Sequence, residues 1–136
     1  MALMMPNAGQ SYALQALVAK TAATVPILNL YQNNYTPAET DTAASYTAAT
    51  FTGYAAISLG TGASWTISGG NPTQIAYTQQ TFTCSTTGTT QQIYGYYVTA
   101  TTSGTLLWAE KFTDGPYPIT NLGDNIKITP TITCNG

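Results

Sequence analysis

Apolar and polar positions alternate most clearly between residues 91 and 112, where the pattern predicts two strands joined by a short turn. Isoleucine, tyrosine and valine fill the first arm, and leucine and tryptophan fill the second, residue types that suit a pleated, half-buried surface. Residues 101–104 separate the arms, and Gly104 can adopt the positive φ that tight turns use. Because an isolated hairpin is only marginally stable in water, we expect the other strands to pack against it.

Seven further stretches predict short strands, at residues 25–31, 46–51, 54–59, 64–68, 73–84, 117–120 and 125–134. The alternation in the stretch at 73–84 slips near Gln79 and Gln80, where a β-bulge would restore the buried face. Three isoleucines share one face of the last stretch, and Pro130 favours a sheet edge there. Eight or nine short strands predict an all-β domain over residues 25–136, an antiparallel two-sheet sandwich of jelly-roll type.

The N-terminal residues 1–24 lie outside this alternating pattern. Residues 1–10 show no periodicity and contain Pro6 and Gly9, so we expect a loose arm. Ser11 is suited to cap a short helix over residues 12–23, and Lys20 lies near its end, where the helix dipole favours a cation. One short N-terminal helix therefore precedes the sandwich.

The composition predicts one folded, weakly charged domain. The chain has 136 residues, of which 43% are hydrophobic and only 6% are charged, and 27 are threonine. It carries a net charge of −2, with three lysines and no arginine, so it lacks the basic surface that nucleic acids and anionic membranes require. We expect neither as a partner. Such low charge also gives little repulsion between copies, which favours association.

Neither a membrane anchor nor a targeting segment is predicted. The most apolar stretch, around residues 13–18, is too short to span a bilayer, and residues 1–6 lack the cationic start of a secretion signal. Cys84 and Cys134 match no metal-binding spacing. Two alternatives stay open for them: two reduced thiols, or one disulfide that ties the last strand to the middle of the chain.

The residues for catalysis are scarce. The chain has no histidine, which removes the commonest general base and most zinc sites. Glu110 is the best candidate for a glycosidase acid, but it lies beside Lys111 on a polar face that predicts a surface position. Glu39 and Asp41 fall in a polar loop at residues 33–42 without EF-hand spacing, so we expect a solvated loop. We therefore expect a protein without catalytic residues, metal or cofactor.

Aromatic side chains are the other candidate functional groups. Tyr94 and Tyr96 share one face of the hairpin and Ile93 and Tyr97 the other, so one set is expected in the core. The remaining set is expected at a subunit interface or on a shelf for carbohydrate. The predicted interface residues are Tyr12, Leu14, Leu17, Tyr94, Tyr96, Trp108 and Tyr117.

Four segments between residues 28 and 132 resemble small structural proteins of tailed bacteriophages: NNYTPAETDT, FTGYAAISL, YGYYVTATTSGTLLWAEKF and DGPYPITNLGDNIKITPTI. Some proteins of this kind are cement proteins, whose jelly-roll domains clamp neighbouring capsomers. The resemblance implies a protein that stabilises the capsid exterior by bridging major capsid protein subunits. It implies a location on the outer capsid surface of the virion, after assembly in the host cytoplasm. The alternative is a carbohydrate- or receptor-binding sandwich of a phage tail or cell surface.

Two further expectations follow from the resemblance. A cement role favours a homo-oligomer, and we expect a trimer. Residues 1–23 are expected to reach the capsid shell or a sister subunit, because they lie outside the strand pattern. Removal of residues 1–10 should then abolish capsid binding and leave the sandwich folded.

Overall fold

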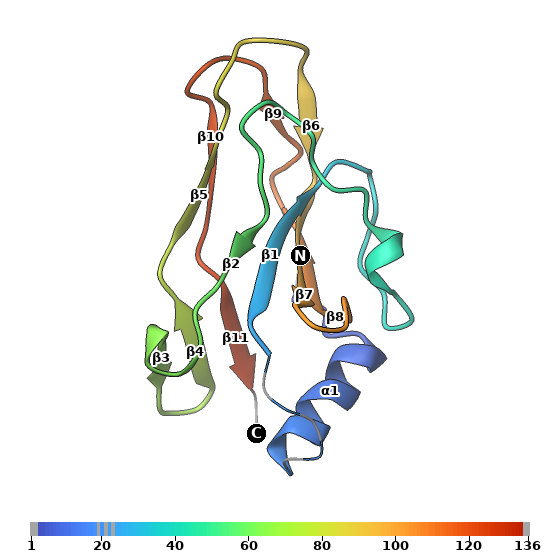
Figure 1. Ribbon diagram of the computed structural model, residues 1–136, viewed down its shortest axis with the longest axis vertical. Helices are drawn as coiled ribbons and strands as arrows, with labels where there is room; N and C mark the ends of the chain where they lie inside the picture. The colour runs from blue at the N-terminus through green and yellow to red at the C-terminus, as the bar shows by residue number, and fades with distance from the viewer. Residues whose placement is uncertain (1–2, 19, 21, 23, 135–136) are drawn as a thin grey trace.

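The computed structural model describes residues 3–18, 20, 22 and 24–134 (Figure 1). It confirms a mostly β protein with antiparallel sheets and one short α-helix, α1 (Asn7–Leu17). The strands are β1 (Pro26–Tyr31), β2 (Ile57–Ser58), β3 (Trp65–Ser68), β4 (Thr73–Tyr77), β5 (Gln80–Thr83), β6 (Gln91–Ile93), β7 (Gly95–Ala100), β8 (Leu106–Lys111), β9 (Tyr117–Ile119), β10 (Asn125–Ile128) and β11 (Thr131–Cys134). Single 3₁₀ turns occur at Ala43–Ser45 and Gly62–Ser64.

The main sheet has four antiparallel strands in the order β2-β1-β7-β8. The predicted hairpin is confirmed in β7 and β8, and Gly104 in its turn has a φ of 67°. The first arm is shorter than predicted, because the chain leaves this sheet at Tyr94. Before that residue, β6 pairs with β9 and not with any strand of the main sheet.

A long antiparallel ribbon lies opposite the main sheet, formed by β4 with β11 and by β5 with β10 (Figure 1). Ala76 pairs with Thr131 and Gln80 pairs with Ile128, so the three residues 77–79 oppose the two residues 129–130. This is the β-bulge that the slipped alternation predicts. Strand β3 extends the ribbon beside β4, and β11 is an outer strand, as Pro130 predicts.

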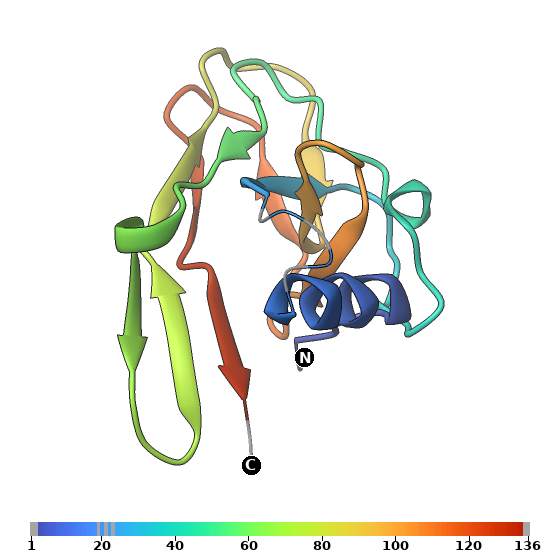
Figure 2. The same ribbon diagram turned by 60° about the horizontal axis from the view of Figure 1, so that its bottom comes forward.

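The larger hydrophobic cluster lies between the main sheet and the ribbon, which face one another in Figures 1 and 2. Every second side chain of β10 points into it, as the alternation of the last predicted strand requires. Its buried members from these two layers include Leu28, Leu30, Tyr96, Val98, Trp108, Phe82, Ile126 and Ile128. Burial of this apolar surface is the main term that stabilises the fold.

A smaller cluster covers the opposite face of the main sheet, so β7 is buried on both faces. Here the Tyr46 ring stacks on Tyr97 with centroids 5.0 Å apart. The strand predicted at residues 46–51 is wrong, since that segment makes only a single bridge, between Tyr31 and Ala48. The apolar side chains of this segment pack into two different clusters: Tyr46 belongs to the smaller cluster and Phe51 to the larger one. The strand predicted at 54–59 is reduced to β2.

The described part of the N-terminal arm is fixed to the main sheet, so the predicted loose arm is wrong. Met4 pairs with Ala109 through two backbone hydrogen bonds of 2.9 Å, and Pro6 is fully buried. Helix α1 begins at Asn7, five residues earlier than predicted, because its first turn docks on β8, where Gly9 lies against the Leu107 backbone. The helix ends before Lys20, and the predicted helical residues 19, 21 and 23 lie outside the described residues.

Candidate functional site

Two of the predicted interface residues lie in the core. Tyr96 is 5% exposed and Trp108 is 4% exposed, and both contribute to the larger hydrophobic cluster. Their prediction as surface residues is wrong. Alternation along a strand shows which residues share a face, but it does not show that both faces of the strand are covered. Here the ribbon covers the face that carries Tyr96 and Trp108, and the smaller cluster covers the other.

Tyr94 and Tyr117 are half-buried and lie in different environments. The Lys111 ammonium lies 5.9 Å from the centroid of the Tyr94 ring. The Tyr117 ring packs on Phe112, and its hydroxyl donates a hydrogen bond to Asp114 Oδ1. This hydrogen bond raises the pKa of Tyr117 and lowers the pKa of Asp114. Both rings are therefore part of the packing around the hydrophobic clusters.

The remaining predicted residues lie on α1, which carries no charged side chain. Tyr12 faces inward, packs against the larger cluster and donates its hydroxyl hydrogen to the Ala22 carbonyl. Leu14 is 66% exposed and Leu17 is 81% exposed, and the sequence reasoning missed a third member, Val18, which is 71% exposed. Leu14 and Leu17 share one side of α1 because they are three positions apart, and Val18, the residue at its C-cap, lines a shallow depression together with Leu14. We call Leu14, Leu17 and Val18 the helix patch.

An apolar cleft of about 430 Å³ lies beside the inner face of α1. Figure 2 shows the helix on one side and strand β11 on the other. The side chains that form its walls include Tyr12, Trp65, Ile75, Leu107, Trp108 and Ile132. Thr24 lines the cleft as well. Among the described residues, Thr24 Oγ1 and Trp108 Nε1 are the buried side-chain polar atoms without a hydrogen-bond partner.

A hydrogen bond between Tyr96 and Glu110 lies near this part of the core. The Tyr96 hydroxyl donates a 2.8 Å hydrogen bond to Glu110 Oε2. Burial and then the Glu110 carboxylate raise the pKa of Tyr96 far above its usual value. Glu110, the candidate for a glycosidase acid, is half-buried and accepts this hydrogen bond from Tyr96.

The loop at residues 33–42 is organised around a buried carboxylate, which corrects the predicted solvated loop. Asp41 is 5% exposed and accepts hydrogen bonds from the hydroxyls of Tyr35 and Tyr46, at 2.6 and 2.7 Å, and from the Ala38 amide at 2.8 Å. Its neighbour Glu39 is exposed. The described residues contain no group of three or more His, Cys, Asp or Glu side chains that could hold a metal ion.

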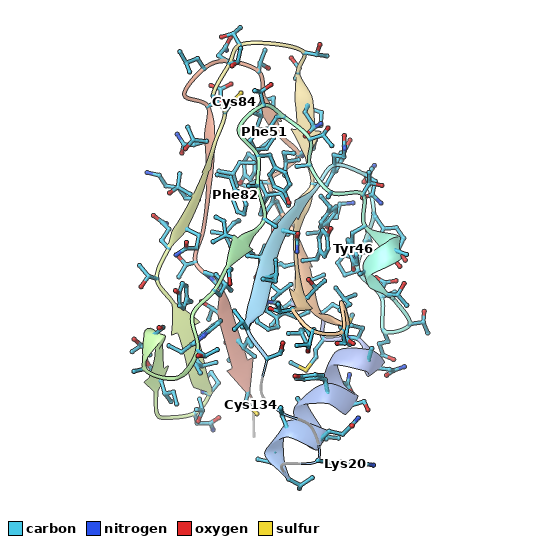
Figure 3. All side chains as sticks on the ribbon, in the orientation of Figure 1. Lys20, Tyr46, Phe51, Phe82, Cys84 and Cys134 are labelled. Carbon is cyan, nitrogen blue, oxygen red and sulfur yellow. The ribbon has the colours of Figure 1, made fainter. Side chains whose placement is uncertain are left out.

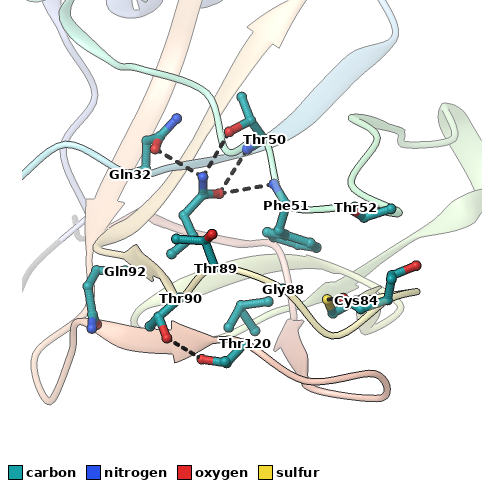
Figure 4. A pocket seen from close by; sticks show the side chains of 13 residues that line it. Gln32, Thr50, Phe51, Thr52, Cys84, Gly88, Thr89, Thr90, Gln92 and Thr120 are labelled. Atoms are coloured by element: carbon teal, nitrogen blue, oxygen red, sulfur yellow. Dashed lines mark hydrogen bonds between the residues drawn. The ribbon is translucent and has the colours of Figure 1, made fainter.

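A second depression, which we call the polar crater, has a volume of about 420 Å³ (Figure 4). Threonines and glutamines from four separate stretches form it: Gln32 and residues 50–52, 84–92 and 119–120. The sequence analysis did not find this site, since its residues come together only in the folded chain. A high density of threonine at 81–90 is the one local signal that could have pointed to it.

Both cysteines are free thiols, which decides between the two alternatives. Cys84 is buried, where it donates to the Thr86 carbonyl, and Cys134 is exposed. Figure 3 shows them toward opposite ends of the molecule. A disulfide requires Cα atoms within about 7 Å, so the fold keeps these thiols apart.

No protein family model, curated protein or solved structure matches this chain. Within the described ranges, no helix is long and apolar enough to cross a membrane. The function proposed below rests on the residues, their geometry and the resemblance described above.

Proposed function

We propose that this protein decorates the exterior of a tailed-phage capsid and stabilises it by bridging major capsid protein subunits. The observation that carries the proposal is the helix patch: two large apolar side chains exposed on a helix without charged residues and a third at its C-cap. Exposed apolar groups that gather on one part of a surface mark interaction sites, and interface centres are depleted of charged residues. The helix patch is therefore the contact surface.

The way α1 is attached supports this role. Met4 pairs with Ala109 on one side of the helix start, and Gly9 lies directly against the Leu107 backbone. Two anchors hold the helix on β8, so the patch is presented in one orientation before binding. A surface ordered in advance loses less conformational entropy when a partner docks. Many weak contacts of this kind, repeated over a shell, add through multivalency.

The proposal includes the architecture and the assembly state. The main sheet and the ribbon form the two layers of an antiparallel sandwich of jelly-roll type. The protein acts without catalysis or cofactor, as a homo-oligomeric, trimeric component on the outer surface of the virion, after assembly in the host cytoplasm. A net charge of −2 on 136 residues supports close packing of copies, because it gives little mutual repulsion.

The alternative of a carbohydrate- or receptor-binding protein of a phage tail or cell surface has less support from the aromatic residues. Stacking against a sugar needs an exposed ring, and Trp108 is buried. Tyr117 keeps only a half-buried ring that already packs on Phe112. The exposed apolar groups of α1 favour a protein partner instead.

The test mixes the purified protein with capsids that lack it, followed by sedimentation and a thermal melt of the shell. We expect co-sedimentation that saturates at a fixed ratio and a higher melting temperature of the shell. A double substitution, Leu14→Gln with Leu17→Gln, should abolish both effects and leave the protein folded, because both side chains are exposed. Leu122→Gln is the matched control, since Leu122 is 69% exposed but lies outside the helix patch.

Two outcomes would count against this reading. If the wild-type protein stays in the supernatant and the shell melts unchanged, capsid decoration is wrong. If the double variant and Leu122→Gln both bind like wild type, the helix patch is not the contact surface. Truncation of residues 1–10 is unsuitable as a test, because it removes the Met4–Ala109 pair and the start of α1.

A further inference from the structure

The polar crater lies at the end of the molecule away from α1. Figure 3 shows Phe51 and Cys84, which line the crater, toward one end and Lys20, just beyond α1, at the other. A partner bound at the helix patch would therefore leave the crater open. The crater is also chemically unlike the patch, since most of its wall consists of hydroxyl and amide groups.

One side chain, Gln91, links three of the contributing stretches through hydrogen bonds. Its Oε1 accepts hydrogen bonds from the amides of Thr50 and Phe51, at 2.8 and 3.2 Å. Its Nε2 donates to Thr50 Oγ1 at 2.8 Å and to Gln32 Oε1 at 3.0 Å. Both donors and both acceptor positions of this amide are thus used within the protein. They hold Gln32, Thr50 and Phe51 in place as one wall of the crater.

The fourth stretch is attached by a second set of hydrogen bonds. The hydroxyls of Thr90 and Thr120 lie 2.7 Å apart, and the Gly88 amide donates to the Thr120 carbonyl at 2.9 Å. Both walls are therefore held in place before any ligand arrives. Sites with walls fixed in this way bind with a smaller entropic cost.

Other polar groups in the crater are not used by the fold. The hydroxyls of Thr52, Thr86 and Thr89 and the amide of Gln92 are exposed and make no hydrogen bond within the part of the chain that the structure describes. Each hydroxyl can donate one hydrogen bond and accept others, and the amide can do both. The crater thus offers several mixed donor and acceptor groups to a ligand.

The lining also excludes several kinds of ligand. No lining residue carries an ammonium or a carboxylate group, so the crater has no direct ion partner for a phosphate or an amine. A wholly apolar ligand would leave the threonine hydroxyls without partners, at an energetic cost. Phe51 and Ile119 also line the crater but are only 8% and 2% exposed, so a ligand would meet mainly hydroxyl and amide groups.

We infer that the polar crater is a binding site for a neutral saccharide. Such a ligand has many hydroxyls that both donate and accept hydrogen bonds, and it carries no charge. The volume of about 420 Å³ falls within the range of small-molecule sites, roughly 300–1,000 Å³, and provides space for a short saccharide. In a decorated capsid this site would face away from the helix patch.

The experiment uses the full chain without capsids, so its result does not depend on capsid decoration. The protein is applied to an array of immobilised neutral and charged oligosaccharides. Glucose-, galactose- and mannose-containing disaccharides and the corresponding polysaccharides are then titrated by calorimetry. We expect binding to at least one neutral saccharide and weaker binding to charged ones. Binding of free disaccharides would indicate recognition of a small sugar, and binding of polysaccharides alone would indicate a surface glycan.

The variant for this test is Thr52→Val with Thr89→Val, which removes two crater hydroxyls and nearly preserves shape. Loss of two hydrogen bonds should weaken binding by about tenfold or more. Thr66→Val on β3 is the matched control, because Thr66 is exposed and lies outside the crater. The inference is overturned if no neutral saccharide binds, if charged saccharides bind better, or if the double variant binds like wild type.

Discussion

Asp41 holds two tyrosine hydroxyls and one backbone amide around a carboxylate that is only 5% exposed. Its hydrogen bonds connect the loop at 33–42 to Tyr46, which stacks on Tyr97 of the main sheet. A carboxylate is the right group here, because it accepts several hydrogen bonds at once and forms stronger ones than a neutral acceptor. The smaller cluster therefore depends on one charged residue.

Asp41→Asn should lower the free energy of unfolding by about 2 kcal/mol, because an amide replaces a charged acceptor and one of its atoms can only donate. The measurement is urea unfolding at neutral pH, followed by tyrosine and tryptophan fluorescence. Glu39→Gln is the matched control in the same loop, since Glu39 is exposed, and it should change the stability little. Equal effects of the two substitutions would show that Asp41 has no special role.

The pKa of Asp41 also predicts how stability depends on pH. Burial alone would raise this pKa, but hydrogen bonds from Tyr35, the Ala38 amide and Tyr46 together lower it below its usual 3.8. A carboxyl with a lowered pKa in the folded state stabilises the fold above the unfolded pKa and loses this contribution as the pH falls through the folded value.

We therefore expect the unfolding free energy to decrease as the pH drops below about 3.8. The unfolding free energy of the Asp41→Asn variant should decrease more gradually with falling pH, because one of the contributing carboxylates is gone. Asp114 and Asp124 also have lowered pKa values, from the Tyr117 hydroxyl and from the backbone amides of Asn121 and Thr120, so part of the slope should remain. Unfolding curves from pH 7 to 2.5 measure this, and parallel pH profiles would contradict it.

At the scale of elements, the contact between α1 and β8 determines where the helix patch points. A Cβ added to Gly9 would lie 2.1 Å from the Leu107 carbonyl oxygen. That oxygen belongs to the backbone of a buried strand and cannot rotate away as a flexible side chain would. Only glycine lets the helix approach β8 this closely.

Gly9→Ala should therefore lower the free energy of unfolding by about 1–3 kcal/mol, the usual cost of overpacking, although alanine favours helix. The helix should also detach more often, which limited proteolysis near the N-terminus would detect. Gly69→Ala is the matched control, because no atom lies within 4 Å of its added Cβ and its φ is not positive. A Gly9→Ala protein as stable as the control would show that α1 is not closely docked.

For the whole molecule, the low charge determines which forces can attach it to a partner. The chain carries three lysines and five acidic residues, and the helix patch contains none of them. Contacts made by leucine and valine side chains depend on the burial of apolar surface, which is not screened by salt. Attachment through the helix patch should therefore differ from attachment through ion pairs.

Co-sedimentation with capsids should persist when the salt concentration rises from about 0.05 to 0.5 M, a range over which exposed ion pairs are strongly screened. The bound fraction is measured at each concentration, with Leu14→Gln/Leu17→Gln as the non-binding reference. Release of the wild-type protein at the higher salt concentration would instead indicate that its few charges provide the attachment. That outcome would show that burial of the helix patch is not the main source of attachment.

The elements with a local signal were predicted well. The hairpin of β7 and β8, the positive φ of Gly104 and the bulge at residues 77–79 each depend on neighbouring residues and on the pleat of a strand. The Met4–Ala109 pair and the early start of α1 were not predicted, because they depend on a strand about a hundred residues away. The same holds for the crater, whose residues extend from Gln32 to Thr120.

By itself, the sequence determined that the protein is mostly β, weakly charged and without histidine, because strand propensity, alternation and composition are local or additive properties. It also identified Leu14 and Leu17 as candidate contact residues, although their exposure could not be known. The tertiary structure alone decided that Tyr96 and Trp108 are core residues, that Asp41 is buried and that a polar crater exists. Burial depends on what covers a side chain, and the covering residues come from distant parts of the chain.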